Sequence, residues 1–478
     1  MTDIRASRRA LLAGAGAMAA LARAPAVAAP ARKPNLLFIM ADDMGYADLS
    51  CTGRPDYQTP RLDRLAAEGV RFLQGYANSA VCSATRAGLM TGRYQNRLAV
   101  GLEEPLGKPD IGLPPDIPSL PSLLRKQGYT SALIGKWHLG MLPKFGPLQS
   151  GYDHFWGFRG GGIDYFRHGF GNNRDLWDDD TKVDSSKGYI TDLLGDRAIA
   201  MLEGWAKQEK PFLMSLHFNA PHWPWEGPDD QAESDRVNKP GGDIFDFDGG
   251  SLKTYAAMVT RLDFQIGRVL DRLQQLGLAG NTIVVFTSDN GGERYSDNYP
   301  FNGRKTELLE GGIRVPLIVR WPGHTKAGTT SDQVAISMDW LPTFLAIAGG
   351  TPDPAFPSDG MDLRSAIEGG APVARTLCWR YLNLAQEACR DGDWKYLKIL
   401  DNSFLFNVVD DPMERANHKD RDPERFARLK TLYADWNAKM LPLDPKANTW
   451  GLSGKDAADH YGVKENRTTP TLKEKIGD

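Results

Sequence analysis

The sequence lacks an excess of charge of either sign. Its 57 lysines and arginines nearly balance 60 aspartates and glutamates in a chain of 478 residues. This balance argues against a nucleic-acid footprint and against a polybasic patch for membrane surfaces. After about residue 30 there is no long apolar run, so no transmembrane helix is predicted, and no internal repeat is visible. The 12 Trp, 50 Gly and 31 Pro favour a compact, loop-rich enzyme over a coiled coil or a disordered chain.

Cysteine is also scarce, and the four residues are Cys51, Cys82, Cys378 and Cys389. Cys378 and Cys389 flank a predicted strand turn and can pair in an oxidising compartment, although sequence alone does not show that their geometry allows it. A lone cysteine such as Cys82 is usually a buried apolar thiol. Here, however, 83–90 is predicted as a helix that Gly92 ends. Cys82 would then lie at a helix N-terminus, where backbone N–H groups favour an anion.

The first 29 residues have a character of their own. The run Ser7-Arg8-Arg9-Ala10-Leu11-Leu12 precedes a weakly hydrophobic Ala/Gly-rich stretch, and Ala26-Val27-Ala28 supplies small residues that a signal peptidase accepts. This pattern resembles a twin-arginine export signal over residues 1–29, with the mature chain starting near Pro30. The alternative is a short membrane anchor, but the apolar run is too short and Arg23 interrupts it. We therefore expect a periplasmic or secreted protein that uses the twin-arginine export machinery and has no stable membrane association.

Predicted strands and helices alternate along most of the chain. The apolar run 35–40 is typical of a strand that is buried on both faces, and 251–273 has apolar residues at helical spacing. The expected strands are 35–40, 70–72, 130–134, 212–218, 282–286 and 315–319, and the expected helices are 60–68, 83–90, 119–127 and 251–273. This alternation favours an α/β fold with a large, mostly parallel sheet that helices cover on both faces.

The pattern changes after about Leu363. Short antiparallel strands are expected at 377–381, 387–389, 394–399 and 404–408, followed by an amphipathic helix at 423–440. These elements predict a small C-terminal α+β domain over 364–445. It would follow a large N-terminal domain, 30–363, and precede a tail, 446–478, for which no element is predicted.

Polar residues follow the carboxyl ends of several predicted strands: Asp42, Asp43, Lys136, His138, His222, Asp289 and Asn290. Open α/β sheets bind ligands at this edge, so residues that are far apart in the sequence can converge there. Asp42-Asp43 and Asp289-Asn290 offer carboxylate and amide oxygens, which suit a hard divalent cation. Paired acids at a strand end also cap helices or line solvated turns, so this signal is not specific by itself.

The most informative motif is Cys82-Ser83-Ala84-Thr85-Arg86. It resembles the sulfatase signature, usually C-x-P-S-R or C-x-A-S-R, with Thr85 in the place of the commoner serine. Other segments match the same family in its order: Gly135-Lys136-Trp137-His138-Leu139-Gly140, Pro221-His222-Trp223-Pro224, and Gly303-Arg304-Lys305 before Glu310-Gly311-Gly312-Ile313-Arg314-Val315-Pro316. The resemblance, which runs from about Pro34 to about Met440, is to formylglycine-dependent type I sulfatases, the arylsulfatase-like enzymes of the alkaline phosphatase superfamily.

This resemblance implies an alkaline-phosphatase-like fold, a catalytic large domain and a defined site. Cys82 would be oxidised to formylglycine by a formylglycine-generating enzyme, and its hydrated aldehyde would attack sulfur. One Ca²⁺ per chain, with Mg²⁺ as the alternative, would be held by Asp42, Asp43, Cys82, Asp289 and Asn290. The implied catalytic residues are Cys82, Arg86, Lys136, His138, His222 and Lys305. In this scheme cations stabilise the sulfate charge, His222 protonates the leaving oxygen, and His138 helps to release sulfate.

Single residues of these motifs can also be interpreted as structural or surface residues without a role in catalysis. A lone lysine is usually a solvated surface charge and a lone histidine a core residue, but motif context favours function for Lys136, Lys305, His138 and His222. For His217, a structural role is as plausible as contact with substrate. A Gly-rich stretch contains further aromatic and polar residues that either line a substrate pocket or pack an irregular loop: Trp156, Phe158, Asp164, Tyr165 and His168.

The predicted function is hydrolysis of aryl or carbohydrate sulfate monoesters to an alcohol and inorganic sulfate. One alternative is a formylglycine-dependent phosphonate monoester or phosphodiester hydrolase of the same superfamily. Phosphatases of this superfamily typically use two metals, whereas here Lys136 and Lys305 stand where a second cation would be useful. A second alternative is an exported anion- or glycan-binding protein, which would need neither an oxidisable cysteine nor a leaving-group histidine. The sequence leaves the choice between aryl and sugar esters open, as well as the oligomeric state.

Overall fold

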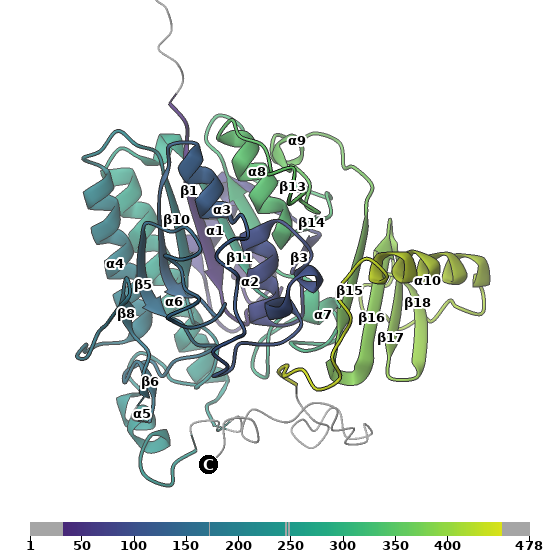
Figure 1. Ribbon diagram of the computed structural model, residues 1–478, viewed down its shortest axis with the longest axis horizontal. Coiled ribbons are helices and arrows are strands. Elements are labelled where there is room, and N and C mark those ends of the chain that lie inside the picture. Colours follow the sequence, from purple (N-terminus) through teal and green to yellow (C-terminus); the bar gives the residue numbers. More distant parts are fainter. Residues whose placement is uncertain (1–31, 172, 244–245, 247–248, 452–478) are drawn as a thin grey trace, which may run out of the picture. The chain divides into compact units, whose positions relative to one another are not determined.

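The computed structural model describes residues 32–171, 173–243, 246 and 249–451. The predicted export signal, 1–29, and most of the predicted tail, 446–478, lie outside the described residues. From Pro34 onward the described chain forms one compact unit, which is drawn in Figure 1. No helix within the described ranges is long and apolar enough to cross a membrane.

A ten-stranded sheet forms the centre of this unit (Figure 1). Its strands are β1 (Asn35–Ala41), β2 (Val70–Phe72), β4 (Thr130–Lys136), β5 (His154–Phe158), β8 (Trp177–Asp178), β9 (Thr181–Lys182), β10 (Phe212–His217), β11 (Thr282–Ser288), β12 (Leu317–Arg320) and β13 (Thr329–Ser331). Their order is β13-β2-β12-β11-β1-β10-β4-β5-β8-β9. The middle strands, from β11 to β5, run parallel, while β12 and β8 run antiparallel to their inner neighbours. Two short pairs stand apart from this sheet: β3 (Gly75–Tyr76) with β14 (Ala335–Ile336), and β6 (Gly169–Phe170) with β7 (Asn173–Arg174).

Helices cover both faces of this sheet because its middle strands are apolar on both sides. Alternate side chains of β1 enter two separate cores, with Leu37 and Ile39 on one face and Leu36 and Phe38 on the other. The first core is closed by α1 (Pro60–Glu68), α4 (Ile190–Trp205) and α6 (Leu252–Gln275), and the second by α2 (Cys82–Thr91), α3 (Leu120–Lys126) and α8 (Trp340–Ile347). Shorter helices are α5 (Gln231–Val237), α7 (Glu310–Ile313) and α9 (Arg364–Ile367).

The C-terminal region is a four-stranded antiparallel sheet with one helix packed on it (Figure 1). Its elements are β15 (Thr376–Tyr381), β16 (Gln386–Asp391), β17 (Trp394–Ile399), β18 (Asn402–Asn407) and α10 (Pro423–Asn437). Cys378 and Cys389 face each other across β15 and β16, with their Sγ atoms 3.0 Å apart as free thiols. Their pairing in an oxidising compartment stays a prediction.

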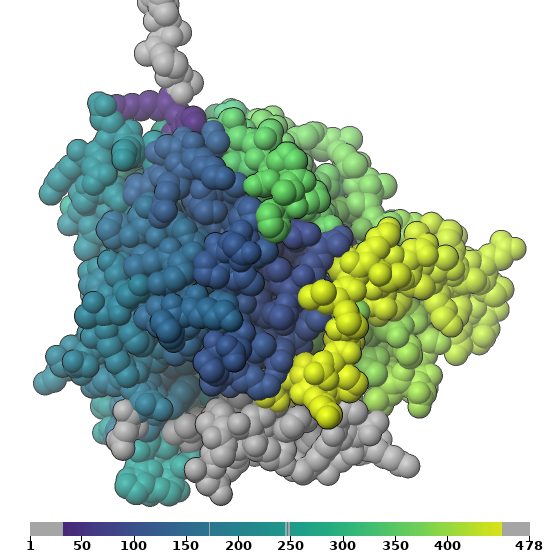
Figure 2. Space-filling view, viewed as in Figure 1, coloured from purple at the N-terminus to yellow at the C-terminus, as the bar shows by residue number. Residues whose placement is uncertain are grey.

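Buried polar contacts join this sheet to the rest of the unit. The ammonium of Lys395 on β17 lies between Glu310 of α7, at 3.0 Å, and Glu414, at 2.9 Å. Further along, the backbone N–H of Leu441 donates to the carbonyl of Asn96 at 3.0 Å. In Figure 2 this yellow segment lies against the dark-blue residues of the N-terminal half. The small sheet is therefore anchored through specific contacts rather than through an apolar surface alone.

The predicted α/β class, with a mostly parallel sheet and a small antiparallel C-terminal sheet, is confirmed, but several elements were not predicted, among them β5 and α4. β5 is short and lies at the start of the Gly-rich stretch. α4 begins after Tyr189, which makes no side-chain cap hydrogen bond, so the usual start signal of a helix is missing. The predicted strand 315–319 is β12, two residues later, and the predicted helix 423–440 is α10, which ends at Asn437.

Candidate active site

The carboxyl ends of the parallel strands bring the predicted site residues together. Asp42 and Asp43 follow β1, Lys136 ends β4, and Asp289 follows β11. The last residues of β1 pair in register with the last residues of β10 and β11, so the side chains beyond them meet at one edge. All the predicted site residues are buried: Asp42, Asp43, Cys82, Arg86, Lys136, His138, His222, Asp289, Asn290 and Lys305.

The backbone at this edge takes conformations that few residues adopt. Gly135 has φ 111°, and a Cβ there would lie 1.8 Å from the carbonyl oxygen of His217, so only glycine lets β4 come this close to β10. Asp43 and His138 have φ of 63° and 54°, in the left-handed region. Non-glycine residues in this region cluster at functional sites, because the surrounding structure must hold them there.

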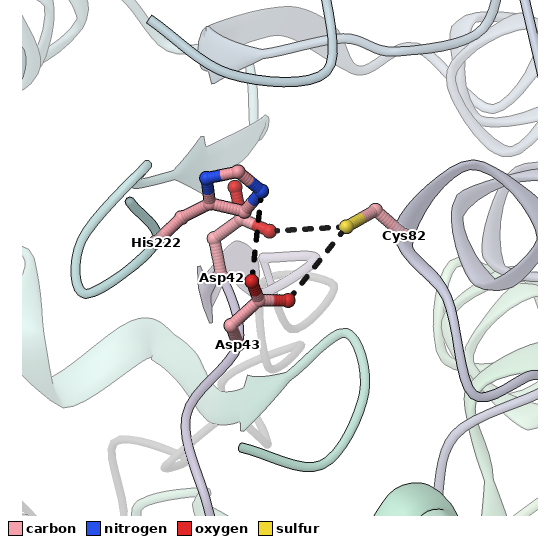
Figure 3. A group of neighbouring side chains, drawn as sticks. All are labelled: Asp42, Asp43, Cys82 and His222. Carbon is pink, nitrogen blue, oxygen red and sulfur yellow. Dashed lines mark hydrogen bonds and ion pairs between the residues drawn. The ribbon is translucent and has the colours of Figure 1, made fainter. Parts of the chain in front are cut away.

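Cys82 is the first residue of α2, as predicted, and only 3% of its side chain is exposed. Its Sγ lies 3.3 Å from Oδ1 of Asp42 and 3.8 Å from Oδ1 of Asp43, as Figure 3 shows. Burial, together with the charges of Asp289 and Asp42, raises the pKa of the thiol well above its usual value. An unmodified Cys82 is therefore a neutral thiol, which is a poor nucleophile.

The acidic residues fit a divalent cation. Ligand atoms of Asp42, Asp43, Cys82 and His222 all lie within 4.8 Å of one another. Oδ1 of Asn290 is buried beside them without a hydrogen-bond partner among the described residues, although its Nδ2 donates to Asp43 at 2.8 Å. Burial and Asp289 raise the pKa of Asp42 to about 8, against the opposing effect of Lys136. Crowded carboxylates and an unused amide oxygen are the donor set of a hard cation.

Three cations surround the same carboxylates. Nζ of Lys136 lies 2.7 Å from Asp42, and Nζ of Lys305 lies 2.6 Å from Asp43. The guanidinium of Arg86 donates from Nε and Nη2 to one oxygen of Asp289, at 3.1 and 2.8 Å. Both lysine side chains are almost fully buried, so their charges act in a medium of low dielectric constant.

The histidines differ in their surroundings. His222 donates from Nδ1 to the carbonyl of Trp223 at 2.6 Å, and its Nε2 lies 3.5 Å from Asp43 (Figure 3). Neither ring nitrogen of His138 has a hydrogen-bond partner among the residues that the structure describes. Burial, and next the charge of Lys136, lowers the pKa of His138 well below its usual value, so its ring is neutral and able to accept a proton. His217 instead contacts Arg86, at 3.3 Å from Nδ1, which is a supporting position.

Sequence reasoning missed several residues that touch this site. A carboxylate oxygen of Glu104 lies 4.0 Å from Nε2 of His138, and Glu104 also accepts from the backbone N–H of Trp450. Glu293 lies 3.7 Å from Nζ of Lys305. Of these residues, only Glu293 could have been predicted from the sequence, because it lies three residues after the Asn290 of the Asp289-Asn290 pair. Glu104 and Trp450 come from irregular segments without a motif.

A pocket of about 630 Å³ opens beside Cys82. Its walls include His138, His222 and Lys305, and the glycine run 160–162. Of the two interpretations given above for five residues of the Gly-rich stretch, the structure favours packing, because none of them lines this pocket and all are buried or half-buried: Trp156 and Phe158 on β5, and Asp164, Tyr165 and His168. The neighbouring residues 169–170 and 173–175 line it instead. The volume lies within the range of roughly 300–1,000 Å³ that is typical of small-molecule sites.

Comparison with known proteins decides which family this site belongs to. The family model for sulfatases matches residues 34–350. The chain is a member of the sulfatase family. This sulfatase is 32% identical to N-acetylgalactosamine-6-sulfatase from Mus musculus, over 87% of this chain and 88% of the relative. It is 31% identical to arylsulfatase A from Homo sapiens, over 81% and 79% of the two chains.

Solved structures of sulfatases share the fold. The crystal structure of Ps i-CgsB in complex with k-i-k-neocarrahexaose matches with a TM-score of 0.76 and 30% identity, over 85% of this chain and 93% of that one. The putative sulfatase yidJ from Bacteroides fragilis matches with a TM-score of 0.68 and 24% identity, over 85% of this chain and 96% of that one, which is a likeness of fold. The predicted alkaline-phosphatase-like fold is thereby confirmed, and the protein is an enzyme that hydrolyses sulfate esters.

The cation site of this sulfatase can be tested through stability. We expect Ca²⁺ or Mg²⁺ to raise the free energy of unfolding by about 2.7 kcal/mol at about 100 times its Kd, because the cation binds only the folded arrangement of donors. Unfolding curves in chelator and in each cation measure this difference. Asn290→Ala should weaken binding in calorimetry, whereas Asn407→Ala, on the C-terminal sheet, should not. Identical curves in chelator and in both cations would contradict the site.

Proposed function

We propose that this sulfatase cleaves aryl or carbohydrate sulfate monoesters through a formylglycine at position 82. The observation that carries the proposal is the place of Cys82. Its Sγ faces Asp42 and Asp43 from the N-terminus of α2, where backbone N–H groups favour an anion. The N-acetylgalactosamine-6-sulfatases and the oligosaccharide complex of Ps i-CgsB support a carbohydrate ester, and arylsulfatase A supports an aryl ester.

A divalent cation and a hydrated aldehyde at residue 82 would complete the site. Asp42, Asp43, Asp289, Asn290 and residue 82 would hold a Ca²⁺ or Mg²⁺ ion, whose chemistry is to lower the pKa of a bound hydroxyl and to polarise the sulfate. A hydrated aldehyde at residue 82 would supply one hydroxyl for attack on sulfur and a second whose deprotonation releases sulfate. A serine hydroxyl offers only the first of these, which is why the oxidation matters.

The sulfate oxygens would be held by the buried cations. Lys136 is paired with Asp42 and Lys305 with Asp43, and the charges of both ammonium groups act on the side chain of Cys82. Arg86 is fixed by Asp289 and would help to hold the diol at residue 82. Charge that develops on the sulfate oxygens in the transition state would therefore meet donors already in place, which is the largest contribution to catalysis in many hydrolases.

Two histidines would handle the protons. Burial, and next the charges of Lys305 and Lys136, lowers the pKa of His222 well below its usual value. His222 would therefore gain its proton only with a bound sulfate ester, whose negative charge favours the protonated ring, and would then protonate the oxygen of the leaving alcohol. His138, held neutral by burial, would accept the proton of the remaining hydroxyl when sulfate leaves. His222 and His138 would thus act in different steps, so His222 can be protonated in the first step while His138 is neutral in the second.

The alternative of a phosphonate monoester or phosphodiester hydrolase has weaker support. The phosphonate monoester hydrolase of Agrobacterium radiobacter matches with a TM-score of 0.61 at 23% identity, a likeness of fold alone. Two-metal phosphatases clamp the phosphate between two ions, whereas here Lys136 and Lys305 would supply single charges, which suits a monoanionic sulfate ester. Rates on matched aryl sulfate and aryl phosphate esters should favour the sulfate. Equal or reversed rates would favour the alternative.

Maturation and location form part of the same proposal. Cys82 and the whole of α2 are buried, so a formylglycine-generating enzyme would have to act before the chain folds. Twin-arginine export carries folded proteins, and oxidation would therefore precede export to the periplasm. Aldehyde found only in periplasmic protein, with intact thiol in the cytoplasmic precursor, would contradict this order.

The mass of the tryptic peptide Phe72–Arg86, from protein made in its native host, tests the nucleophile directly. We expect loss of sulfur and gain of an aldehyde oxygen at Cys82, because only the aldehyde can provide both hydroxyls. An intact thiol in protein that hydrolyses sulfate esters would assign the nucleophile to another group. An intact thiol in inactive protein would point to failed maturation, which co-expression of a formylglycine-generating enzyme should repair.

A further inference from the structure

The pocket beside Cys82 carries two cations that the proposed chemistry does not use. Arg174, on β7, and Lys182, on β9, line the same cavity as Cys82 and His222. Within the described part of the chain, neither cation has a carboxylate at ion-pairing distance. Most of the arginines that the structure describes pair with an acid, for example Arg167, Arg197 and Arg261, whereas Arg174 and Lys182 line a pocket without such a pair.

Arg174 is the more informative of the two. Its Nη1 is buried and has no hydrogen-bond partner among the described residues. The adjacent carboxylate, Asp175, is occupied, because it accepts from the backbone N–H of Arg159 and Gly160, at 3.1 and 2.7 Å, and from Nε1 of Trp177, at 2.7 Å. A buried guanidinium N–H without an acceptor is costly. Its planar fork fits a carboxylate or sulfate that enters from the pocket.

Lys182 extends the positive charge toward the surface. Its side chain is exposed, and its Nζ lies 5.9 Å from the ring centroid of Trp177. The guanidinium carbon of Arg159 lies 4.7 Å from the same centroid. Trp177 also lines the pocket, so its ring and the two pocket cations form one wall with both apolar and positive character.

This wall lies on the side of the pocket where the alcohol would leave. The glycine run 160–162 connects it to the catalytic histidines: a Cβ on Gly161 would lie 2.7 Å from the ring of His138, and one on Gly162 would lie 3.2 Å from the ring of His222. At the other end of the run, Gly160 donates to Asp175. Consecutive Cα atoms are about 3.8 Å apart, so the three-residue glycine run places Asp175, and with it Arg174, close to His222, the proposed acid for the leaving alcohol.

We propose that Arg174 and Lys182 form a subsite for a second anionic group of the substrate. The substrate class is then a sulfated glycan that carries, on the unit beside the cleaved ester, a further sulfate or a carboxylate. This inference rests on the proposed function, because it takes His222 as the group that faces the leaving alcohol. A simple aryl sulfate would fill the catalytic end of the pocket and leave these two cations without a ligand.

The test compares substrates and variants with the mature enzyme. The substrates are an aryl sulfate and three disaccharides, which carry one sulfate, two sulfates, or one sulfate and one uronate carboxylate. We expect wild-type kcat/KM to be higher for the dianionic disaccharides than for the monosulfated one. The Arg174→Ala, Lys182→Ala double variant should lose roughly 10- to 100-fold on the dianionic substrates, mainly through KM, with no change on the aryl sulfate. The better of the two dianionic disaccharides identifies the anion.

Controls separate a lost ligand contact from damage to the fold. Unchanged turnover of the aryl sulfate shows that each variant is folded. Arg167→Ala removes a nearby arginine that pairs with Asp235 at 3.2 Å and does not line the pocket, and it should leave all the rates unchanged. Arg174→Lys, which keeps the charge but not the fork, should lose less than Arg174→Ala.

Two results would overturn the inference in different ways. If aryl sulfate is hydrolysed but the second anion brings no advantage, or if the double variant loses equally on all substrates, the subsite is wrong while the proposed function stands. If enzyme with oxidised Cys82 hydrolyses no sulfate ester of the panel, the proposed function fails first.

Discussion

Replacing Cys82 with alanine is expected to lower kcat by roughly 10⁶-fold, the size of effect seen when a hydrolase loses its nucleophile. The fold should survive, because Cys82 is a small buried side chain at the start of α2 and, among the described residues, its thiol is hydrogen-bonded only to Asp42 and Asp43. Steady-state hydrolysis of an aryl sulfate by wild type and variant measures the loss. Binding of the same ester to Cys82→Ala should persist, since Lys136 and Lys305 are still present.

Cys82→Ser gives a sharper version of this test. A serine hydroxyl can attack sulfur but has no second hydroxyl with which to expel sulfate, so the variant should turn over at most once and retain a sulfo group on Ser, visible by mass spectrometry. The matched control is Cys51→Ala, a half-buried cysteine outside the site, which should keep wild-type rates. Sustained turnover by Cys82→Ala would show that Cys82 is not the nucleophile. Of the conclusions above, only the sulfatase fold and family would then stand.

Replacing Lys395 with methionine should destabilise the protein by about 3–5 kcal/mol, because it leaves the buried carboxylate of Glu414 without its cation, whereas Glu310 keeps Arg314 at 2.9 Å. Lys395 is fully buried between Glu310 and Glu414, which also hold the C-terminal sheet against α7. Urea unfolding measures the free energy. Lys398→Met is the matched control, since Lys398 lies on the same strand but pairs with Glu387 at the surface, where such a pair is worth about 0.2–1 kcal/mol.

The loss of unfolding free energy in Lys395→Met, the deficit relative to wild type, should also depend on pH. Burial raises the pKa of Glu414 to about 7, even though Lys395 opposes that effect. A folded-state pKa above the unfolded value contributes stability that is present at low pH and lost as the pH rises through the folded pKa. Removing Lys395 raises the pKa of Glu414 further, so the deficit should be larger near about pH 8 than near about pH 5. A deficit below about 1 kcal/mol at both values would show that the lysine is not needed to hold the sheet.

Much of the site was predictable because its residues follow strands whose apolar runs are easy to recognise. Asp42 and Asp289 each come directly after a strand that is buried on both faces, and parallel strands end at a common edge. The helix start at Cys82 was predictable from the residues after it, and the structure places it as expected. The residues that support or extend the site were not, since Glu104 and Trp450 come from irregular segments and Arg174 from the two-residue strand β7, and the course of these segments depends on tertiary packing.

By itself the sequence determined the α/β class, the family and the set of groups that meet beside Cys82, because strand periodicity and the order of the motifs are local properties of the chain. Only the tertiary structure decided which face of the pocket is charged, since Nη1 of Arg174 lacks a hydrogen-bond partner, within the described ranges, only in the folded arrangement that occupies Asp175. It also decided how Lys395, an ordinary strand lysine in the sequence, comes to lie between two acids. Burial and pairing are relations between distant segments, and no local pattern records them.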